Sequence, residues 1–343
     1  MRIAVIAPPW VPVPPTAYGG TEMVIDTLAR GLRGAGHEVL LATTGDSTCP
    51  VERTWFHDHA RTDEIGDMAI GLTHLLHAYD AAASADIVHD HTVAGPVIGS
   101  LRSTRPIVTT NHGLFTDDMR ALYRSLGDRV SIVAISHHHA STAGDVPIAR
   151  VIHHGLDEDR YPVGPGGDHL VFVGRMSPTK GVRQAIEIAE RAGRPLVLAA
   201  KMRSTDEHDY FDTEIKPLLG GDIHFAGEVG TADKLELLGG ALALVNPIRW
   251  DEPFGLCMVE ALACGTPVIA APRGAAPEIV DHGVTGFLCT GTEEAAAATT
   301  WAGALDRRAC RAAVTARFSA HRMVADHVAL YHDVLAGRVR PAA

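Results

Sequence analysis

One stretch of the chain constrains its fold most strongly: VNPIRWDEPFGLCMVEALACGTPVIAA, residues 245–271. The apolar residues up to Val245 are typical of a buried strand, and a polar loop follows them. We place Pro253 at the first position of a helix, because the fixed φ and missing N–H of proline cost nothing there. Gly265 ends this helix, and residues 268–271 form a second buried strand. The sequence therefore predicts a strand–loop–helix–strand unit.

This unit carries two carboxylates. Glu252 lies in the loop, and Glu260 lies eight positions later within an apolar helix, where a carboxylate costs free energy unless something binds it. One interpretation is a glutamate that faces water from the helix surface. The other is a pair of acids at the mouth of a parallel sheet, where a polyhydroxylated ligand offers donors. Between the acids, the Phe254, Gly255 and Leu256 amides form a helix N-terminus that favours a phosphate or hydroxyl oxygen.

The composition narrows the class of protein. With 343 residues, 46% hydrophobic and 21% charged, the chain is an ordinary globular protein of about two domains. No run approaches the length of a transmembrane segment, and the first ten residues contain prolines that argue against a signal peptide, so we expect a cytoplasmic protein. The net charge of −11 argues against nucleic acid as a partner. Five cysteines without metal-like or disulfide-like spacing suit a reducing compartment.

The N-terminal part has a strand–helix–strand pattern. Residues 2–7 and 39–43 are typical of buried strands, and residues 21–32 of the helix between them, which predicts a parallel sheet with a right-handed crossover. Gly19 and Gly20 precede the helix, but the G-x-G-x-x-G pattern of a dehydrogenase is absent. The two glycines still allow backbone N–H groups to approach a diphosphate.

Three apolar runs in the same half end in histidine or serine: residues 86–91, 107–113 and 130–136. Because the carboxyl ends of parallel strands meet at one edge of a sheet, we expect these polar side chains to line that edge. The chain has 20 histidines, which raises the question of a metal site. No H-E-x-x-H pattern is present and the histidines follow separate strands, so we expect no metal.

Residues 160–167 are rich in glycine and proline and mark a domain boundary. The second half opens with a buried strand up to Val173 and a helix from about Gly181, with Arg175 and Lys180 in the connecting segment. Both cations could be ordinary solvated loop residues. However, the chain contains only four lysines, and an arginine and a lysine beside a helix N-terminus are well suited to a diphosphate.

Three motifs together resemble one family. They are the E-x7-E element in DEPFGLCMVEALACGTPVIA, the Arg and Lys pair in FVGRMSPTKG, and YGGTE at the start of the first helix. The chain strongly resembles glycosyltransferase family 4, retaining enzymes of the GT-B fold, over nearly its whole length. More loosely, it resembles the P-x-x-YGG subgroup, which includes antibiotic-pathway sugar transferases. One departure is His154-Gly155, where the family commonly has Asn-Gly.

The resemblance implies an α/β fold of the GT-B class, with two Rossmann-like domains whose parallel sheets face each other across a cleft. We expect residues 1–160 to form the N-terminal domain on the acceptor side. Residues 168–318 would form the C-terminal domain, which holds the nucleotide-sugar donor. Residues 319–337 would form a helix that packs back across the domains.

The resemblance also assigns roles to charged residues. Arg175 and Lys180 would hold the donor diphosphate, Glu252 would contact hydroxyls of the transferred sugar, and Glu260 would bind the ribose. His112 matches the family's histidine near the sugar. Arg175, Lys180, Glu252 and His112 are therefore the candidate catalytic residues.

Further positions would bind the donor mainly through the backbone. Gly19 and Gly20 would approach the phosphates, and Glu228 lies where neighbouring backbone meets the base. The start of the central helix would offer amides to the sugar and phosphate, from Phe254, Gly255 and Leu256.

The expected activity is retaining transfer of a hexose from a nucleotide-diphosphate sugar to an acceptor hydroxyl. A UDP-sugar such as UDP-glucose is the expected donor on family frequency, while the acceptor stays unidentified. Two alternatives remain: a GT-B sugar-nucleotide 2-epimerase and a non-catalytic nucleotide-sugar-binding protein. We expect no cofactor and no metal, because the arginine and lysine already neutralise the diphosphate.

Overall fold

The computed structural model describes residues 1–17 and 19–339. Tyr18 of the YGGTE motif lies outside the described residues. The chain folds into two compact units: unit 1 comprises Met1–Leu156 and the C-terminal segment from Ala320, and unit 2 comprises Asp157–Ser319. The border between them falls just before the glycine- and proline-rich segment 160–167.

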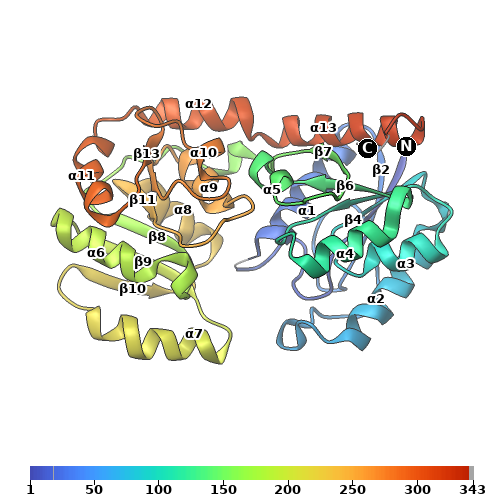
Figure 1. Cartoon of the computed structure of the whole chain (residues 1–343), viewed down its shortest axis with the longest axis horizontal. Helices are drawn as coiled ribbons and strands as arrows, with labels where there is room; N and C mark the ends of the chain where they lie inside the picture. Colours follow the sequence, from blue (N-terminus) through green and yellow to red (C-terminus); the bar gives the residue numbers. More distant parts are fainter. Residues whose placement is uncertain (18, 340–343) are drawn as a thin grey trace. The chain divides into compact units, whose positions relative to one another are not determined.

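Unit 1 is built on a seven-stranded sheet with the order β3-β2-β1-β4-β5-β6-β7 (Figure 1). All neighbouring strands pair in parallel. The inner strands are apolar because helices cover both faces of a parallel sheet. The strands are β1 (Arg2–Ile6), β2 (Glu38–Thr43), β3 (Glu52–Trp55), β4 (Ile87–Asp90), β5 (Ile107–Thr110), β6 (Val130–Ala134) and β7 (Ile148–Val151).

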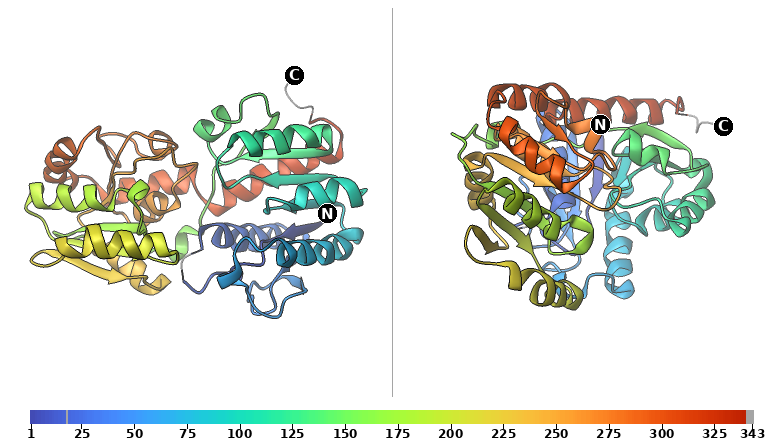
Figure 2. Two further views of the ribbon diagram at one scale, coloured as in Figure 1. Left: turned by 60° about the horizontal axis from the view of Figure 1, so that its bottom comes forward. Right: turned by 60° about the vertical axis from the view of Figure 1, so that its left-hand side comes forward.

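The direction of each crossover decides which face of this sheet a helix covers. The chain moves from β1 to β2 in one direction along the sheet and from β3 onward in the other, so right-handed crossovers place α1 opposite the later helices. The helix α1 (Gly20–Gly34) shares its face with α13 (Ala320–Leu335), and the two lie side by side (Figure 2). The other helices are α2 (Met68–Ala81), α3 (Gly95–Arg102), α4 (Asp117–Leu126) and α5 (His137–Ser141), with short 3-10 turns η1 (Thr62–Glu64), η2 (Ala82–Ser84) and η3 (Gly127–Arg129).

The C-terminal helix α13 belongs to unit 1, where it packs against α1. Gly31 of α1 makes this close contact possible, since a Cβ there would lie 2.3 Å from Cγ2 of Val324. Tyr331 is fully buried, whereas Leu335 at the end of the helix is 40% exposed. The buried face of the helix consists of Met323, Val324, His327, Leu330 and Tyr331.

Unit 2 is built on a six-stranded parallel sheet with the order β10-β9-β8-β11-β12-β13. The strands are β8 (Leu170–Arg175), β9 (Leu196–Lys201), β10 (Ile223–Gly227), β11 (Ala243–Asn246), β12 (Val268–Ala270) and β13 (Gly286–Leu288). One face carries α6 (Val182–Ala192), α7 (Thr205–Tyr210) and α11 (Thr292–Ala302) (Figure 1). The other carries α8 (Thr231–Gly240), α9 (Leu256–Ala263), α10 (Ala276–Ile279) and α12 (Arg307–Arg317). Short turns complete the unit, at η4 (Glu158–Arg160), η5 (Pro178–Lys180), η6 (Phe211–Ile215) and η7 (Lys216–Leu218).

The central helix α9 begins later than the sequence suggests. We expected Pro253 at its first position, but the first helical residue is Leu256 and the N-cap is Gly255, with φ of +96°. A residue in the left-handed region interrupts the helical path, so Pro253 lies in the loop before it. The helix ends at Ala263, and Gly265 adopts a φ of +75° after it.

Candidate functional site

In unit 2, two loops meet at the carboxyl edge of the sheet, one after β8 and one after β11. Gly181 follows the first loop with a φ of +77°, and a Cβ at this position would lie 2.1 Å from the carbonyl oxygen of Pro247. The Arg249 amide also donates to the carbonyl oxygen of Thr179 at 2.8 Å. Only glycine permits this approach, and the two loops are therefore held together by their backbones.

Lys180 from the first loop forms an ion pair with Glu252 from the second. The exposed fractions of the two side chains are 12% and 16%. The ammonium also lies 5.1 Å from the centre of the Trp250 ring, within cation–π distance. Lys180 is therefore not a freely solvated loop cation, and the structure brings together two residues that the sequence placed 72 positions apart.

A second glycine fixes the backbone of Glu252. Gly274 has a φ of +57°, and a Cβ there would lie 2.2 Å from the carbonyl oxygen and 2.4 Å from the nitrogen of Glu252. The neighbouring Ala275 amide donates to the same carbonyl oxygen at 3.0 Å. The Glu252 loop is thus held on one side by the loop after β8 and on the other by the segment after β12.

Glu260 is buried, with an exposed fraction of 4%, so the interpretation of a solvent-facing glutamate was wrong. Lys234 of α8 donates to its Oε1 at 2.6 Å, and the Tyr161 hydroxyl donates at 3.3 Å. Burial and the neighbouring carboxylate raise the pKa of Tyr161, which keeps the phenol protonated. Lys234 and Tyr161 were not predicted from the sequence, although the scarcity of lysine was a usable signal: two of the four lysines pair with the two motif acids.

Arg175 has different neighbours from Lys180. It is 45% exposed and lies 3.5 Å from Oε1 of Glu207. Lys201 is its partner in the register of β8 and β9. Burial, together with the nearby Arg203, lowers the pKa of Lys201 to about 8, while Glu228 acts in the opposite direction. Arginine and lysine side chains therefore gather at this part of the sheet edge.

The start of α9 is ordered by packing. Phe254 is 2% exposed, and its ring meets Phe318 edge to face at a centroid distance of 5.9 Å. Gly255 then turns the chain into the helix at Leu256. The first N–H groups of an α-helix lack intrahelical partners and favour anions or hydroxyl oxygens. The predicted amide-bearing residues thus lie at a fixed helix N-terminus directly after Glu252.

Two side-chain N–H groups near the exit of β11 are buried and have no hydrogen-bond partner among the residues that the structure describes. They are Nε1 of Trp250 and Nδ2 of Asn246. A buried donor without a partner costs free energy, and an oxygen-rich ligand would remove that cost.

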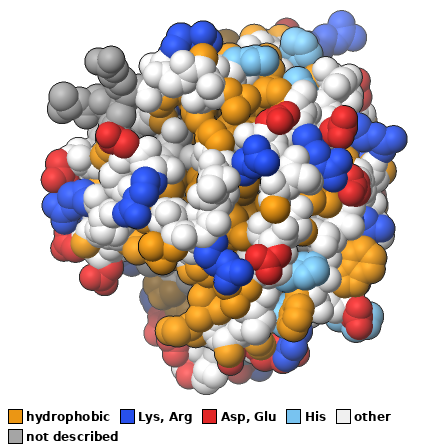
Figure 3. Space-filling model, turned by 90° about the vertical axis from the view of Figure 1, so that its right-hand side faces the viewer, with side chains coloured by type: hydrophobic (Ala, Val, Ile, Leu, Met, Phe, Trp, Pro, Cys, Tyr) orange, Lys and Arg blue, Asp and Glu red, His pale blue; other side chains and the backbone are white. Residues whose placement is uncertain are grey.

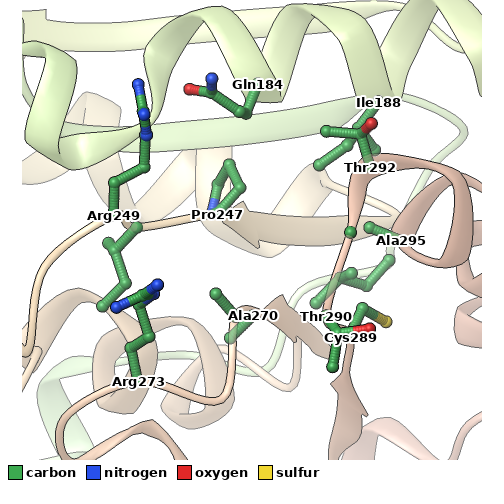
Figure 4. A pocket seen from close by; sticks show the side chains of 14 residues that line it. Gln184, Ile188, Pro247, Arg249, Ala270, Arg273, Cys289, Thr290, Thr292 and Ala295 are labelled. Atoms are coloured by element: carbon green, nitrogen blue, oxygen red, sulfur yellow. The ribbon is translucent and has the colours of Figure 1, made fainter.

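Unit 2 also contains a cavity of about 270 Å³ at the ends of β11, β12 and β13, between α6 and α11. Arg249 and Arg273 lie on one side of it, and Thr290 and Thr292 on the other (Figure 4). None of the residues predicted to bind the donor lines this cavity. We therefore treat it as separate from the candidate donor site.

In unit 1, Gly19 is the N-cap of α1 in an extended conformation, and the helix begins at Gly20. A Cβ at Gly19 would lie 2.7 Å from Cβ of Pro15, whereas a Cβ at Gly20 would have no atom of the described residues within 4 Å. Glu22 in the first turn is 7% exposed. The glycine pair therefore lies at a helix N-terminus, as predicted, and close packing explains the first glycine.

The histidines that follow successive strands of unit 1 lie together, as expected. Nδ1 of His91 and Nε2 of His112 are 2.9 Å apart and share a hydrogen bond. The ring of His112 stacks on His154 at 5.1 Å, and that of His91 lies 4.1 Å from His89. Burial and repulsion by neighbouring histidines lower the pKa of His112 to about 3 and the pKa of His91 well below its usual value. Both rings are therefore neutral near pH 7.

Across residues 1–17 and 19–339, no group of three or more histidine, cysteine, aspartate or glutamate side chains is arranged to hold a metal ion. No helix within these residues is long and apolar enough to cross a membrane. All five cysteines are free thiols.

Comparison with known proteins identifies the family. The family model described as Glycosyltransferase Family 4 matches residues 18–160, and the one described as Glycosyl transferases group 1 matches residues 159–315. The chain belongs to glycosyltransferase family 4. This family 4 enzyme is 27% identical to the glycogen synthase of Mycobacterium tuberculosis over 388 residues, which covers 95% of the chain and 91% of the relative.

Solved structures agree with this family 4 assignment. AviGT4, a glycosyltransferase involved in avilamycin A biosynthesis, is 26% identical, with a TM-score of 0.75 and 98% coverage of each chain. Anabaena HepE shares the fold at 22% identity and a TM-score of 0.75, covering 96% of this chain and 98% of its own. The two parallel-sheet α/β units of the enzyme are those of the GT-B fold.

Proposed function

We propose that this family 4 enzyme transfers a hexose from a UDP-sugar to an acceptor hydroxyl, with retention of anomeric configuration. The observation that carries the proposal is the Lys180–Glu252 ion pair beside Trp250, directly before the N-terminus of α9. Crystal complexes of HepE with UDP and glucose support the choice of donor.

The cations at the sheet edge suit the donor diphosphate. Lys180 has three N–H donors, so it can keep its contact with Glu252 and still bind a phosphate oxygen. Arg175 is partly exposed and offers a planar fork of donors. Negative charge grows on the diphosphate as the sugar leaves, and each well-placed positive group lowers the barrier by about 3 kcal/mol.

The two glutamates are assigned to different hydroxyl groups of the donor. Glu252 would accept hydrogen bonds from the transferred sugar, and Glu260 would accept them from the ribose. Lys234 and Tyr161 hold the Glu260 carboxylate in one orientation. The base would lie near Glu228.

In the proposed reaction, the bond between the anomeric carbon and the diphosphate oxygen breaks, and a bond to the acceptor oxygen forms on the same face of the sugar. The departing phosphate takes the acceptor proton, so no separate base is needed. A double displacement would require Glu252 as nucleophile, but its ion pair with Lys180 favours a binding role. Arg175 and Lys180 supply the positive charge that a metal would otherwise provide.

A calorimetric titration tests the donor site. UDP, GDP and their glucose and mannose conjugates are titrated into the wild type, Lys180→Ala and a control, Lys216→Ala. Lys216 is 64% exposed and pairs with Asp212 on the surface. We expect selective binding of UDP and one UDP-sugar, weakened about 100-fold in Lys180→Ala because a charged hydrogen bond to the diphosphate is lost. Equal affinity in all three proteins would contradict the proposal.

Product analysis separates the alternatives. Nuclear magnetic resonance of the reaction mixture should show a new glycoside with the donor's anomeric configuration and release of UDP. A free epimerised nucleotide sugar formed without an acceptor would indicate a 2-epimerase. Tight donor binding without transfer or hydrolysis would indicate a binding protein.

A further inference from the structure

Unit 1 contains a cavity of about 430 Å³ at the carboxyl ends of β1 and β4. Its walls are the loop after β1, the first turns of α2 and the loop after β4. The volume lies within the range of small-molecule sites, which are mostly apolar with a few placed polar groups. The apolar lining includes Trp10, Met68, Leu72, Leu75 and Val93.

The cavity is preformed by contacts between these segments. The indole of Trp10 lies over Gly71 of α2, where an added Cβ would be 3.7 Å from Cζ2 of the ring. The Thr62 hydroxyl donates to the carbonyl oxygen of Trp10 at 2.7 Å. A ring nitrogen of His74 lies 2.9 Å from the carbonyl oxygen of Ala7, which fastens α2 to the end of β1. A site held in this way needs little reorganisation to bind a ligand.

Apolar side chains around the cavity are open to solvent. The exposed fractions are 77% for Met68, 61% for Val93 and 37% for Leu72. On the face of unit 1 that Figure 3 shows, by contrast, hydrophobic side chains lie between charged ones. An exposed apolar cluster around a cavity is typical of a ligand site.

Most polar groups in the lining already have partners. Oδ1 of Asp67 accepts from two amides at the start of α2, at 2.9 and 3.0 Å. The Thr92 hydroxyl donates to Asp90 at 2.7 Å and accepts from the Gly95 amide at 2.9 Å. Nε2 of His91 differs, because it is buried and has no hydrogen-bond partner within the described residues.

The hydrogen bond between His91 and His112 decides whether Nε2 of His91 is a donor or an acceptor. When Nδ1 of His91 donates to His112, Nε2 carries a lone pair and accepts a hydrogen bond. In the other tautomer Nε2 carries the proton and donates. A hydroxyl group can satisfy either state, since it both donates and accepts.

We propose that this cavity binds the acceptor, and that the acceptor is an amphipathic alcohol whose apolar body fills the cavity while its hydroxyl contacts His91. The proposal rests on the proposed function. Among the described residues, the lining contains no lysine or arginine and includes the carboxylate of Asp67, which disfavours a phosphorylated acceptor. A bare sugar would leave hydroxyls without partners against Leu72, Leu75 and Val93.

The first test compares two ligands with the same sugar. Octyl β-glucoside, kept below its micelle concentration, and methyl β-glucoside are titrated into the full-length protein by calorimetry. We expect the octyl compound to bind at least about tenfold more tightly, since burial of about two methylene groups suffices. Equal affinity, or stronger binding of glucose 6-phosphate, would overturn the proposal.

A pair of variants locates the binding. Leu72 and Leu76 both lie on α2 and are each 37% exposed, but only Leu72 lines the cavity. We expect Leu72→Gln to weaken octyl glucoside binding about fivefold through loss of apolar contact. Leu76→Gln should leave it unchanged. The same effect in both variants, or in neither, would place the ligand elsewhere.

The role of His91 is tested with 2-naphthol and naphthalene, which differ only in the hydroxyl. His91→Phe keeps a ring and removes both nitrogens. It should weaken 2-naphthol about fivefold and leave naphthalene binding unchanged, because one hydrogen bond is lost. Equal changes in the affinities for 2-naphthol and naphthalene would exclude the contact between His91 and the ligand hydroxyl.

The two proposals fail in distinguishable ways. The donor residues Lys180, Glu252 and Glu260 belong to unit 2, so UDP affinity should be the same in Leu72→Gln as in the wild type. Failure of the wild type to bind any UDP-sugar would refute the proposed function. The titrations with octyl β-glucoside and 2-naphthol test the cavity independently of the donor.

Discussion

Gly274 makes no predicted contact with the donor, but Gly274→Ala should displace the Glu252 loop of the donor site. The added Cβ would lie 2.2 Å and 2.4 Å from the carbonyl oxygen and nitrogen of Glu252. Backbone atoms cannot move aside as a flexible side chain does, so the Glu252 loop has to shift. Gly193→Ala is a matched control, because its φ of +59° is close to the +57° of Gly274 but no atom of the described part of the chain lies within 4 Å of its Cβ position.

The expected magnitudes follow from these two environments. A non-glycine residue in the left-handed region costs about 1 kcal/mol, which is the whole cost expected for Gly193→Ala. At Gly274 the overlap adds about 2 kcal/mol or more. In a unit of this size each kcal/mol lowers the melting temperature by about 2–4 °C. We therefore expect a decrease of about 3 °C for the control and about 9 °C for Gly274→Ala.

Differential scanning calorimetry measures the stability, and calorimetric titration with UDP-sugar measures the site. Gly274→Ala should lose donor affinity, since Glu252 and its partner Lys180 move with the loop, while Gly193→Ala should bind normally. Equal melting temperatures for the two variants would refute the claim that backbone contact at Gly274 fixes the loop. Normal donor affinity in Gly274→Ala would show that the position of Glu252 does not matter for binding.

Two further predictions concern buried ionisable side chains. Glu260→Gln should destabilise unit 2 by about 2 kcal/mol, because Lys234 loses its charged partner, and it should weaken UDP binding in the calorimetric titration. The control Glu214→Gln breaks an exposed pair with Arg183 and should change neither the stability nor the UDP affinity. Similar losses in both variants would contradict the role of burial. Burial lowers the pKa of His112 to about 3 and of His74 and His327 to about 4 in unit 1. Below about pH 6.5 the unfolded chain therefore binds protons that the folded unit excludes, and each such histidine removes about 1.4 kcal/mol of stability per pH unit as the pH falls toward its folded value. Asp90, whose pKa burial raises to about 6, opposes this with one group; a melting temperature of unit 1 that does not fall between about pH 7 and about pH 5 would refute the argument.

Many elements could be predicted from local sequence alone. The strands predicted at 2–7 and 39–43 and the helix predicted at 21–32 correspond to β1, β2 and α1 with nearly the same bounds, because apolar periodicity and flanking glycine or polar residues are local signals. The beginning of α9 was misplaced because proline at Pro253 looked like a helix start, whereas the left-handed Gly255 decides where the helix begins. Backbone conformation at a glycine depends on the surrounding structure, so sequence spacing did not reveal it.

The sequence by itself determined the parallel α/β architecture, the charged motif residues and the resemblance to family 4, since these depend on residue type and short-range order. Only the tertiary structure decided which groups meet. It paired Glu252 with Lys180, gave Glu260 its partners Lys234 and Tyr161, and formed an apolar cavity beside His91. Such contacts join segments far apart in the chain, and they depend on strand order, register and close backbone packing, none of which a single sequence states directly.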